Sequence, residues 1–87
     1  MKVVKSDGKR EDFDSKKIRR GIERSAERAK IDKARTREIA EKVAKDVESA
    51  FRDRKEVRSA DIRERVLSTL SREDRKIADS FRNYRSK

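Results

Sequence analysis

The feature that most constrains how this chain folds is a tight turn close to its N-terminus. Val3 and Val4 are β-branched, as the residues of strands often are. Asp7-Gly8 follows them and is a strong signal for a two-residue hairpin loop. Phe13 supplies an apolar side chain on the return arm. The sequence therefore predicts a β-hairpin over about residues 2–13. Because an isolated hairpin is barely stable in water, the rest of the chain must cover it with an apolar surface.

A capped basic helix follows the hairpin. Either Asp14 or Ser15 can cap its N-terminus. Ile18 and Ile22 lie four residues apart and share one helix face. Lysines and arginines lie on both the hairpin and the start of the helix, so they can converge on one anion. The amide groups and the positive end of the helix dipole would point to the same place.

Lys17 is the most informative of these basic residues. It lies in the first turn of the expected helix, where a positive charge opposes the helix dipole. Such a lysine needs either a nearby carboxylate, from Glu11 or Asp14, or a bound anion. We favour the anion.

The rest of the chain has the 3.6-residue apolar period of amphipathic helices. The clearest example is the second helix, where Ile39, Val43 and Val47 share one face. The same apolar stripe is widened by Ala40, Ala44, Ala50 and Phe51. We expect helices at about residues 15–29, 33–52, 59–70 and 72–85.

Serines are the candidate caps of the last two helices. Ser59 can cap the third helix, and Ser71 can cap the fourth through a capping box with Asp74. The stretch Glu56-Val57-Arg58, taken by itself, is typical of a loop. Four amphipathic helices can share one core. The sequence therefore predicts a single α+β domain over residues 1–87, mostly helical: a four-helix bundle with an N-terminal β-hairpin lying across it.

The charge of the chain is its second constraint. Of its residues, 53% are charged and only 31% are hydrophobic, which is close to the composition of disordered chains. The strict apolar period favours a thin helical core instead. The formal net charge of +10 favours an anionic partner: a nucleotide, a nucleic acid or an anionic membrane surface. Solubility and the ion-pair networks of heat-adapted proteins are the alternative explanation.

Several kinds of site are excluded by what the sequence lacks. The absence of Cys and His excludes thiol nucleophiles, histidine acid–base catalysis and Cys/His zinc sites. With only two glycines there is no P-loop, and no carboxylate pair has an apolar context that would raise a pKa for catalysis. We expect no catalytic residue, no protein-built metal site and no enzyme. No apolar run is long enough for a membrane span and no signal-peptide core follows Met1, so we expect a cytoplasmic protein.

Residues of the hairpin and first helix also form a family motif. The matching positions are Val3-Val4-Lys5, Asp7-Gly8, Glu11, Phe13-Asp14, Lys17-Ile18 and Ile22. This run closely resembles the start of the ATP-cone, the nucleotide-sensing regulatory module of ribonucleotide reductases and of the repressor that controls their genes. The resemblance continues through Glu56-Val-Arg-Ser-Ala-Asp-Ile62, Val66-Leu67 and Tyr84-Arg85. It implies that Glu56-Val57-Arg58 is a brief third strand beside the hairpin.

The resemblance also implies a nucleotide site. In the family, the contacts come from the hairpin, from the lysine of the first helix, from the segment opening the third helix and from a basic residue near the end. These positions are Val3, Lys5, Lys17, Ser59, Arg63 and Arg85, with Glu11 at a family acidic position. Val3 would pack on the adenine, and Glu11 would bind a ribose hydroxyl or a magnesium-bound water. Lys9 and Arg10, which open the second strand, are further candidates.

One departure from the family pattern bears on affinity. The family usually has Lys-Arg before Asp-Gly, whereas this chain has Lys5-Ser6. An arginine can bind phosphate through two hydrogen bonds, so its loss weakens phosphate binding. Arg10 or Arg63 can compensate. The alternative is a degenerate cone that binds no nucleotide and acts only as a protein-interaction domain.

The resemblance implies a regulatory module that binds ATP or dATP, with magnesium, and does not hydrolyse it. Since neither a catalytic domain nor a zinc ribbon accompanies it in the sequence, we expect a free-standing cone. Its output would be homo-oligomerisation or its grip on a reductase or regulator chain. The alternative is a small basic nucleic-acid-binding protein, whose phosphate contacts would be Arg52, Arg54, Lys55, Arg58, Arg82, Arg85 and Lys87. Its few aromatic residues, needed in the core, argue against base stacking.

Overall fold

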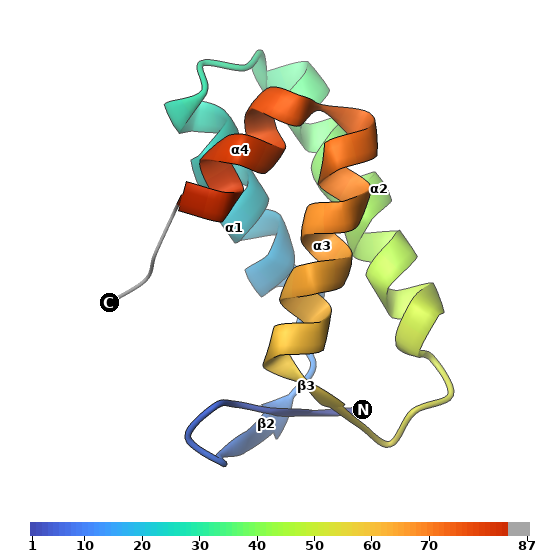
Figure 1. Ribbon diagram of the computed structural model, residues 1–87. Coiled ribbons are helices and arrows are strands. Elements are labelled where there is room, and N and C mark those ends of the chain that lie inside the picture. Colours follow the sequence, from blue (N-terminus) through green and yellow to red (C-terminus); the bar gives the residue numbers. More distant parts are fainter. Residues whose placement is uncertain (84–87) are drawn as a thin grey trace.

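Four amphipathic helices pack their apolar faces together, and a small sheet lies across one end of the bundle (Figure 1). This computed structural model describes residues 1–83. Its elements are, in order, β1 (Lys2–Val4), β2 (Arg10–Asp12), α1 (Ser15–Arg28), α2 (Lys33–Phe51), β3 (Glu56–Arg58), α3 (Ser59–Glu73) and α4 (Arg75–Asn83). The predicted α+β class is confirmed. None of the helices within these residues is long and apolar enough to cross a membrane.

The sheet has the strand order β2-β1-β3, with β1 antiparallel to β2 and parallel to β3. The third strand implied by the family resemblance is therefore present. Val3 lies opposite Glu11 on one side and Val57 on the other. Since neighbours across a sheet share a face, these three residues lie on the same side. Val3 and Val57 are buried, so this is the side that faces the bundle.

The loop of the hairpin differs from the prediction. The backbone N–H of Lys5 donates to the carbonyl of Lys9 at 2.8 Å, and the N–H of Gly8 donates to the carbonyl of Lys5 at 2.9 Å. The loop therefore has three residues, 6–8, and the two-residue loop predicted at Asp7-Gly8 is wrong. Gly8 has a φ of 86°, the left-handed conformation that closes a three-residue loop. Asp7 fixes the turn by accepting the N–H of Lys9 at 3.0 Å.

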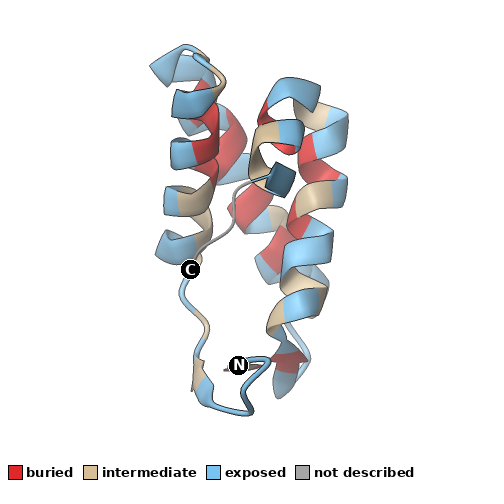
Figure 2. Ribbon diagram, turned by 60° about the vertical axis from the view of Figure 1, so that its left-hand side comes forward, coloured by how far each residue is buried: buried red, intermediate tan, exposed pale blue. Residues whose placement is uncertain are grey.

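The core lies between the helices, and every helix carries buried residues (Figure 2). All four helices contribute to it, and its largest fully buried residues include Ile22, Val43, Leu70 and Ile77. Ala50, predicted on the apolar stripe of α2, is exposed. Ala50 lies in the last turn of α2, next to the exposed loop before β3. At this end of the helix, no other element within residues 1–83 covers the side on which Ala50 lies.

The glycine inside α1 allows a close approach between two helices. A Cβ atom built at Gly21 would lie 3.3 Å from the ring of Phe81. The α4 helix therefore packs tightly against α1 at this point, in agreement with the contacts between the two helices.

The helix caps correct part of the predicted boundaries. The predicted end of the third helix at residue 70 is wrong, because α3 continues to Glu73. Ser71 lies inside it, with its hydroxyl donating to the carbonyl of Leu67 at 2.8 Å. Asp74 has an extended backbone that ends the helix, and its carboxylate accepts the N–H groups of Lys76 and Ile77 at 2.9 and 3.2 Å. The predicted capping box and the predicted start at residue 72 are therefore wrong. The predicted end at residue 85, with Tyr84 and Arg85, lies outside the described residues.

Of the other predicted caps, one is confirmed and one is wrong. Asp14, not Ser15, caps α1 by accepting the N–H of Lys16 at 2.9 Å. Ser59 is the first residue of α3 rather than its cap, and Arg58 in the cap position makes no side-chain cap hydrogen bond. The predicted cap at Ser59 is therefore wrong, because β3 runs directly into the helix.

Candidate functional site

A cavity of about 120 Å³ lies where the sheet meets the first turns of α1 and α3. We call it the sheet-end cavity. Its lining residues are Val3, Glu11, Asp12, Phe13, Asp14, Lys17, Ile18, Ser59 and Ile62. The bundle-facing side of the hairpin, the capped start of α1 and the start of α3 thus form its walls. Four residues predicted to contact nucleotide, Val3, Glu11, Lys17 and Ser59, line this one cavity.

Glu11 joins the two predicted lysines at the cavity. Its carboxylate lies 3.3 Å from the Lys5 ammonium and 3.1 Å from the Lys17 ammonium. The hydrogen bond from Lys17 lowers the pKa of Glu11 most; desolvation opposes it, and Lys5 lowers the pKa further. The carboxylate partner of Lys17 is therefore Glu11 and not Asp14. A single anion already bridges both lysines, and a phosphate could take its place.

Two helix N-termini reach the same end of the bundle (Figure 1). The first turn of α1 contains no acidic residue, although Asp14 caps it. The N-terminus of α3 has no side-chain cap, and the acidic residue in its first turn, Asp61, pairs with Arg58 at 3.2 Å. Free amide groups and the positive ends of two helix dipoles attract an anion. The backbone therefore adds positive potential to the two lysines.

Three other predicted residues among those described, Lys9, Arg10 and Arg63, do not line the cavity. Arg10 forms an ion pair with Glu56 at 2.9 Å across the sheet, and by strand alternation it lies on the face opposite Val3 and Glu11. Lys9 is exposed beside the hairpin loop. Arg63 lies 5.0 Å from the centre of the Phe81 ring and donates to the carbonyl of Phe81 at 3.3 Å. Arg85 lies outside the described residues.

Sequence reasoning missed the apolar floor of the cavity. Phe13, Ile18 and Ile62 line it together with Val3. Ile18 and Ile62 carried a signal that could have found them, because each faces inward from the first turn of a helix that starts at the sheet. The missed acidic residues Asp12 and Asp14 are already engaged. Asp12 pairs with Lys2, which lowers its pKa, and Asp14 caps α1.

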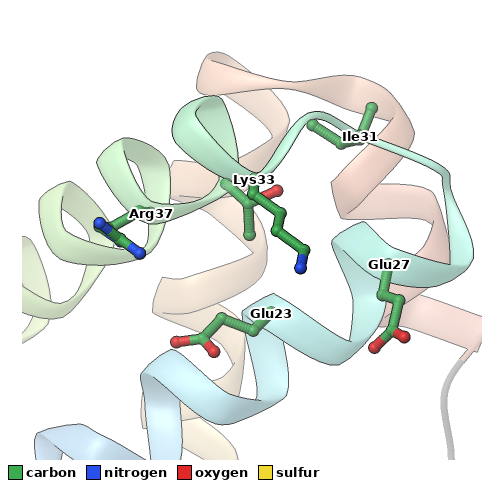
Figure 3. A pocket seen from close by; sticks show the side chains of 6 residues that line it. Glu23, Glu27, Ile31, Lys33 and Arg37 are labelled. Carbon is green, nitrogen blue, oxygen red and sulfur yellow. The ribbon is translucent and has the colours of Figure 1, made fainter.

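A larger cleft of about 510 Å³ lies between α1 and the start of α2, well away from the sheet. Glu23 and Glu27 line it from α1, and Lys33, Thr36 and Arg37 from α2 (Figure 3). Figure 3 shows Lys33 extending toward α1, while the two carboxylates point in different directions. None of the predicted nucleotide contacts within residues 1–83 lines this cleft. Because two carboxylates line it, it suits a triphosphate less well than the sheet-end cavity.

The acidic residues are not arranged to hold a metal ion by themselves. Within residues 1–83, no group of three or more carboxylates comes close enough to form such a site. A magnesium ion at the sheet-end cavity would therefore have to take most of its ligands from nucleotide phosphates and water, as magnesium commonly does. Glu11 is the lining carboxylate best placed to hold one of those waters, because it lies beside both lysines.

Comparison with known proteins gives a family model and two similar proteins. The ATP cone domain family matches residues 1–87. The transcriptional repressor NrdR of Trichodesmium erythraeum (strain IMS101) is 39% identical over 69 residues, which are 79% of this chain and 38% of that protein. The transcriptional repressor NrdR of Shouchella clausii (strain KSM-K16) is 38% identical over 74 residues, 83% of this chain and 46% of that protein. The chain thus spans less than half the length of these relatives. It belongs to the ATP-cone family of nucleotide-binding regulatory domains.

Proposed function

We propose that the chain binds ATP or dATP, together with magnesium, in the sheet-end cavity and does not hydrolyse it. The observation that carries the proposal is the convergence of Lys5 and Lys17 on one carboxylate, at 3.3 and 3.1 Å, beside an apolar cavity. The lysines would bind the phosphates, and Val3 would pack on the adenine. The sequence has no histidine, cysteine or P-loop, which is why we propose binding without hydrolysis.

Nucleotide binding must first separate Glu11 from the two lysines. These ion pairs are largely exposed, and exposed ion pairs contribute little to stability. Their loss is therefore a small cost compared with two charge-assisted contacts to a triphosphate. Once released, Glu11 can accept a ribose hydroxyl or a magnesium-bound water. The same residue thus serves the free and the bound form.

The output that we propose is a change in homo-oligomerisation or in the grip on a reductase or regulator chain. The cavity is lined by residues from the hairpin, from α1 and from α3. A ligand there changes contacts in all three at once. The ligand can shift the assembly equilibrium only by the difference between its binding free energies for the two assembly states. In the named relatives, which are transcriptional repressors, the corresponding segment is part of a longer protein.

A degenerate cone is the second candidate, and two observations favour it. Ser6 is an exposed loop residue where the family has an arginine, and Arg10 is held by Glu56 on the other face of the sheet. Among the described residues, only two of the predicted cations, Lys5 and Lys17, therefore pair with the cavity carboxylate Glu11. In this case the chain would bind no nucleotide and would act through protein contacts alone.

Thermal unfolding in about 0.3 M salt separates the two candidates. The ligands are ATP, dATP, GTP and inorganic triphosphate, each with and without magnesium. A ligand at 100 times its dissociation constant stabilises by about 2.7 kcal/mol, which for this size raises the midpoint by about 10–20 °C. We expect such a rise for ATP or dATP, clearly above GTP and triphosphate. Equal small rises for every polyphosphate would reject the proposal.

Two variants and one control test the site. Lys5→Ala and Lys17→Ala should each abolish the rise with ATP or dATP. Lys45→Ala is the matched control, because Lys45 pairs with Glu41 at 3.8 Å on the outer face of α2, away from the cavity. It removes the same charge and should leave the rise intact. A rise that is lost equally in all three variants would mean that only net charge matters.

A further inference from the structure

A row of four basic side chains runs along the exposed face of α1. Its members are Lys16, Arg20, Arg24 and Arg28, each four residues after the last, and all four are exposed. Residues four apart on a helix are neighbours, with a rise of about 6 Å, so the row is about 18 Å long. We call it the α1 basic row. None of its members lines the sheet-end cavity.

The helix α1 carries a marked excess of positive charge. The 14 residues of α1 include six basic and two acidic side chains, a net charge of +4 out of the +10 of the whole chain. By contrast, residues 1–14 hold four basic and four acidic side chains, and α3 holds three of each. The excess is therefore uneven along the sequence: α1 carries +4 and residues 75–87 carry another +4, whereas residues 1–14 and α3 carry none.

The α1 basic row aligns four like charges. Like charges four residues apart on a helix repel, and the row contains three such successive pairs. Glu23 and Glu27 lie on the same helix and offset part of this charge. The outer face of α2 carries charges of both signs, with ion pairs such as Lys42–Glu73 and Lys45–Glu41. Solubility alone does not require four cations in line, and a linear polyanion along the row would be attracted by all four charges together.

We propose that the α1 basic row binds the phosphate backbone of double-stranded DNA, without reading its sequence. A stiff helix presents four cations at regular spacing, and a duplex presents phosphates at regular spacing. A single strand is less suitable because the row contains no aromatic side chain for base stacking. A membrane is less suitable because Met1 is the only large exposed hydrophobic residue among those described, so the apolar face of a membrane-surface helix is lacking.

Salt-dependent binding to a labelled 20-base-pair duplex tests the proposal. For B-DNA the slope of log K against log salt is about −0.9 per phosphate contact, so four contacts contribute about −3.6. The variant K16Q/R20Q/R24Q/R28Q should reduce the slope by about that amount and weaken binding at 50 mM salt by roughly tenfold or more. The matched control is K33Q/R37Q/K42Q/K45Q, which removes four charges from the mixed face of α2 and should keep most of the slope.

Further variants and ligands make each outcome decisive. The swap K16R/R20K/R24K/R28K keeps every charge and should bind the duplex like the parent chain. Lys5→Ala and Lys17→Ala should leave duplex binding unchanged, so failure of the nucleotide site and failure of this proposal are distinguishable. Loss of duplex binding in those variants would mean that DNA phosphates occupy the nucleotide site, and would overturn the proposal.

Two other results would also overturn the proposal. One is an equal weakening of duplex binding in the α2 control. The other is tighter binding to single strands, or to vesicles of anionic phospholipid, than to the duplex. Thermal unfolding confirms that each variant is folded.

Discussion

The sheet end of the molecule differs from its helical core in the forces that act on its side chains. The core holds Ile22, Val43, Leu70 and Ile77, each with no exposed surface. In the sheet only Val3 and Val57 are buried. Five of the seven charged side chains of the hairpin form ion pairs, such as Lys2–Asp12 and Arg10–Glu56. Burial of apolar surface stabilises far more than exposed ion pairs do.

This difference separates stability from ligand binding. Stability should reside in the helices, because their apolar faces fill the core. Binding should reside at the sheet end, because its charges lie beside a cavity and exchange partners at little cost. A change in the core should therefore lower the unfolding midpoint without changing ligand preference. A change at the sheet end should do the opposite.

Truncation of Leu70 is the largest expected effect. Leu70→Ala removes a fully buried side chain from the cluster that all four helices share, which should cost about 2–5 kcal/mol. Thermal unfolding should show a midpoint lower by about 10–30 °C. Val3→Ala, in the sheet, is the control and should cost clearly less, because Val3 is smaller than Leu70 and keeps 8% of its surface exposed where Leu70 keeps none. Equal losses of stability in the two variants would contradict the view that the helical core is more important for stability than the sheet end.

The corrected cap of α4 gives the next effect. Asp74 accepts two backbone N–H groups and pairs with Arg35 at 3.1 Å, so Asp74→Ala should cost about 1–2 kcal/mol. Ser71→Ala should cost little, because Ser71 is an exposed residue inside α3 and Ala favours helices. Urea unfolding of both variants measures the difference. A larger loss for Ser71→Ala would restore the predicted capping box.

Acid should weaken the helical part through Asp46. Its carboxylate accepts from Arg65 at 2.8 and 3.0 Å and from Thr69 at 2.9 Å, joining α2 to α3. The hydrogen bond from Arg65 lowers the pKa of Asp46 most, desolvation opposes it, and Thr69 adds to the lowering. Because the folded pKa lies below the unfolded one, the contribution is present at neutral pH and is lost as pH falls through the folded value.

The measurement for Asp46 is urea unfolding of Asp46→Asn at pH 7 and at pH 2. We expect a loss of about 1 kcal/mol or less at pH 7, and a smaller difference from the parent chain at pH 2. Glu41→Gln is the control, because its exposed pair with Lys45 is long, at 3.8 Å, and should matter at neither pH. A difference that stays the same at pH 2 would mean that packing, not the charge of Asp46, joins the two helices.

The sequence predicted the fold where the signals are local. The apolar period located all four helices, and Asp14 was a correct candidate for the cap of α1. The errors at the caps arose because Ser71 and Asp74 both resemble caps. In the structure Asp74 is the cap: its backbone is extended, and its carboxylate also pairs with Arg35. That choice depends on a contact 39 residues away, which a local pattern does not contain.

The arrangement of side chains at the candidate site depends on the register of the hairpin, which a shift of one residue would change. A two-residue loop at Asp7-Gly8 would pair Lys5 with Arg10 and place both on the face of the cavity. The three-residue loop instead pairs Lys5 with Lys9 and Val3 with Glu11, so Glu11 lies beside Lys5 and Arg10 lies on the other face. A shift of one residue moves every side chain of a strand to the opposite face. The predicted loop length was wrong, and in the observed register Arg10 lies on the face opposite Glu11 and pairs with Glu56. Its role in nucleotide binding stays a prediction.

Glu11→Gln has the smallest expected effect on stability and sharpens the comparison most. Because the Glu11 pairs are exposed, their loss should leave the unfolding midpoint nearly unchanged. Ligand preference should change, because no carboxylate of the protein then competes with the ligand phosphates for Lys5 and Lys17. We expect inorganic triphosphate to stabilise the variant more than it stabilises the parent chain, so the advantage of ATP over triphosphate should narrow. Glu56→Gln is the matched control: Glu56 pairs with Arg10 on the opposite face of the sheet, so this change should not alter the advantage. A large loss of stability in Glu11→Gln would mean that the sheet end depends on its charges for folding, and the division between a stabilising core and a binding end would fail.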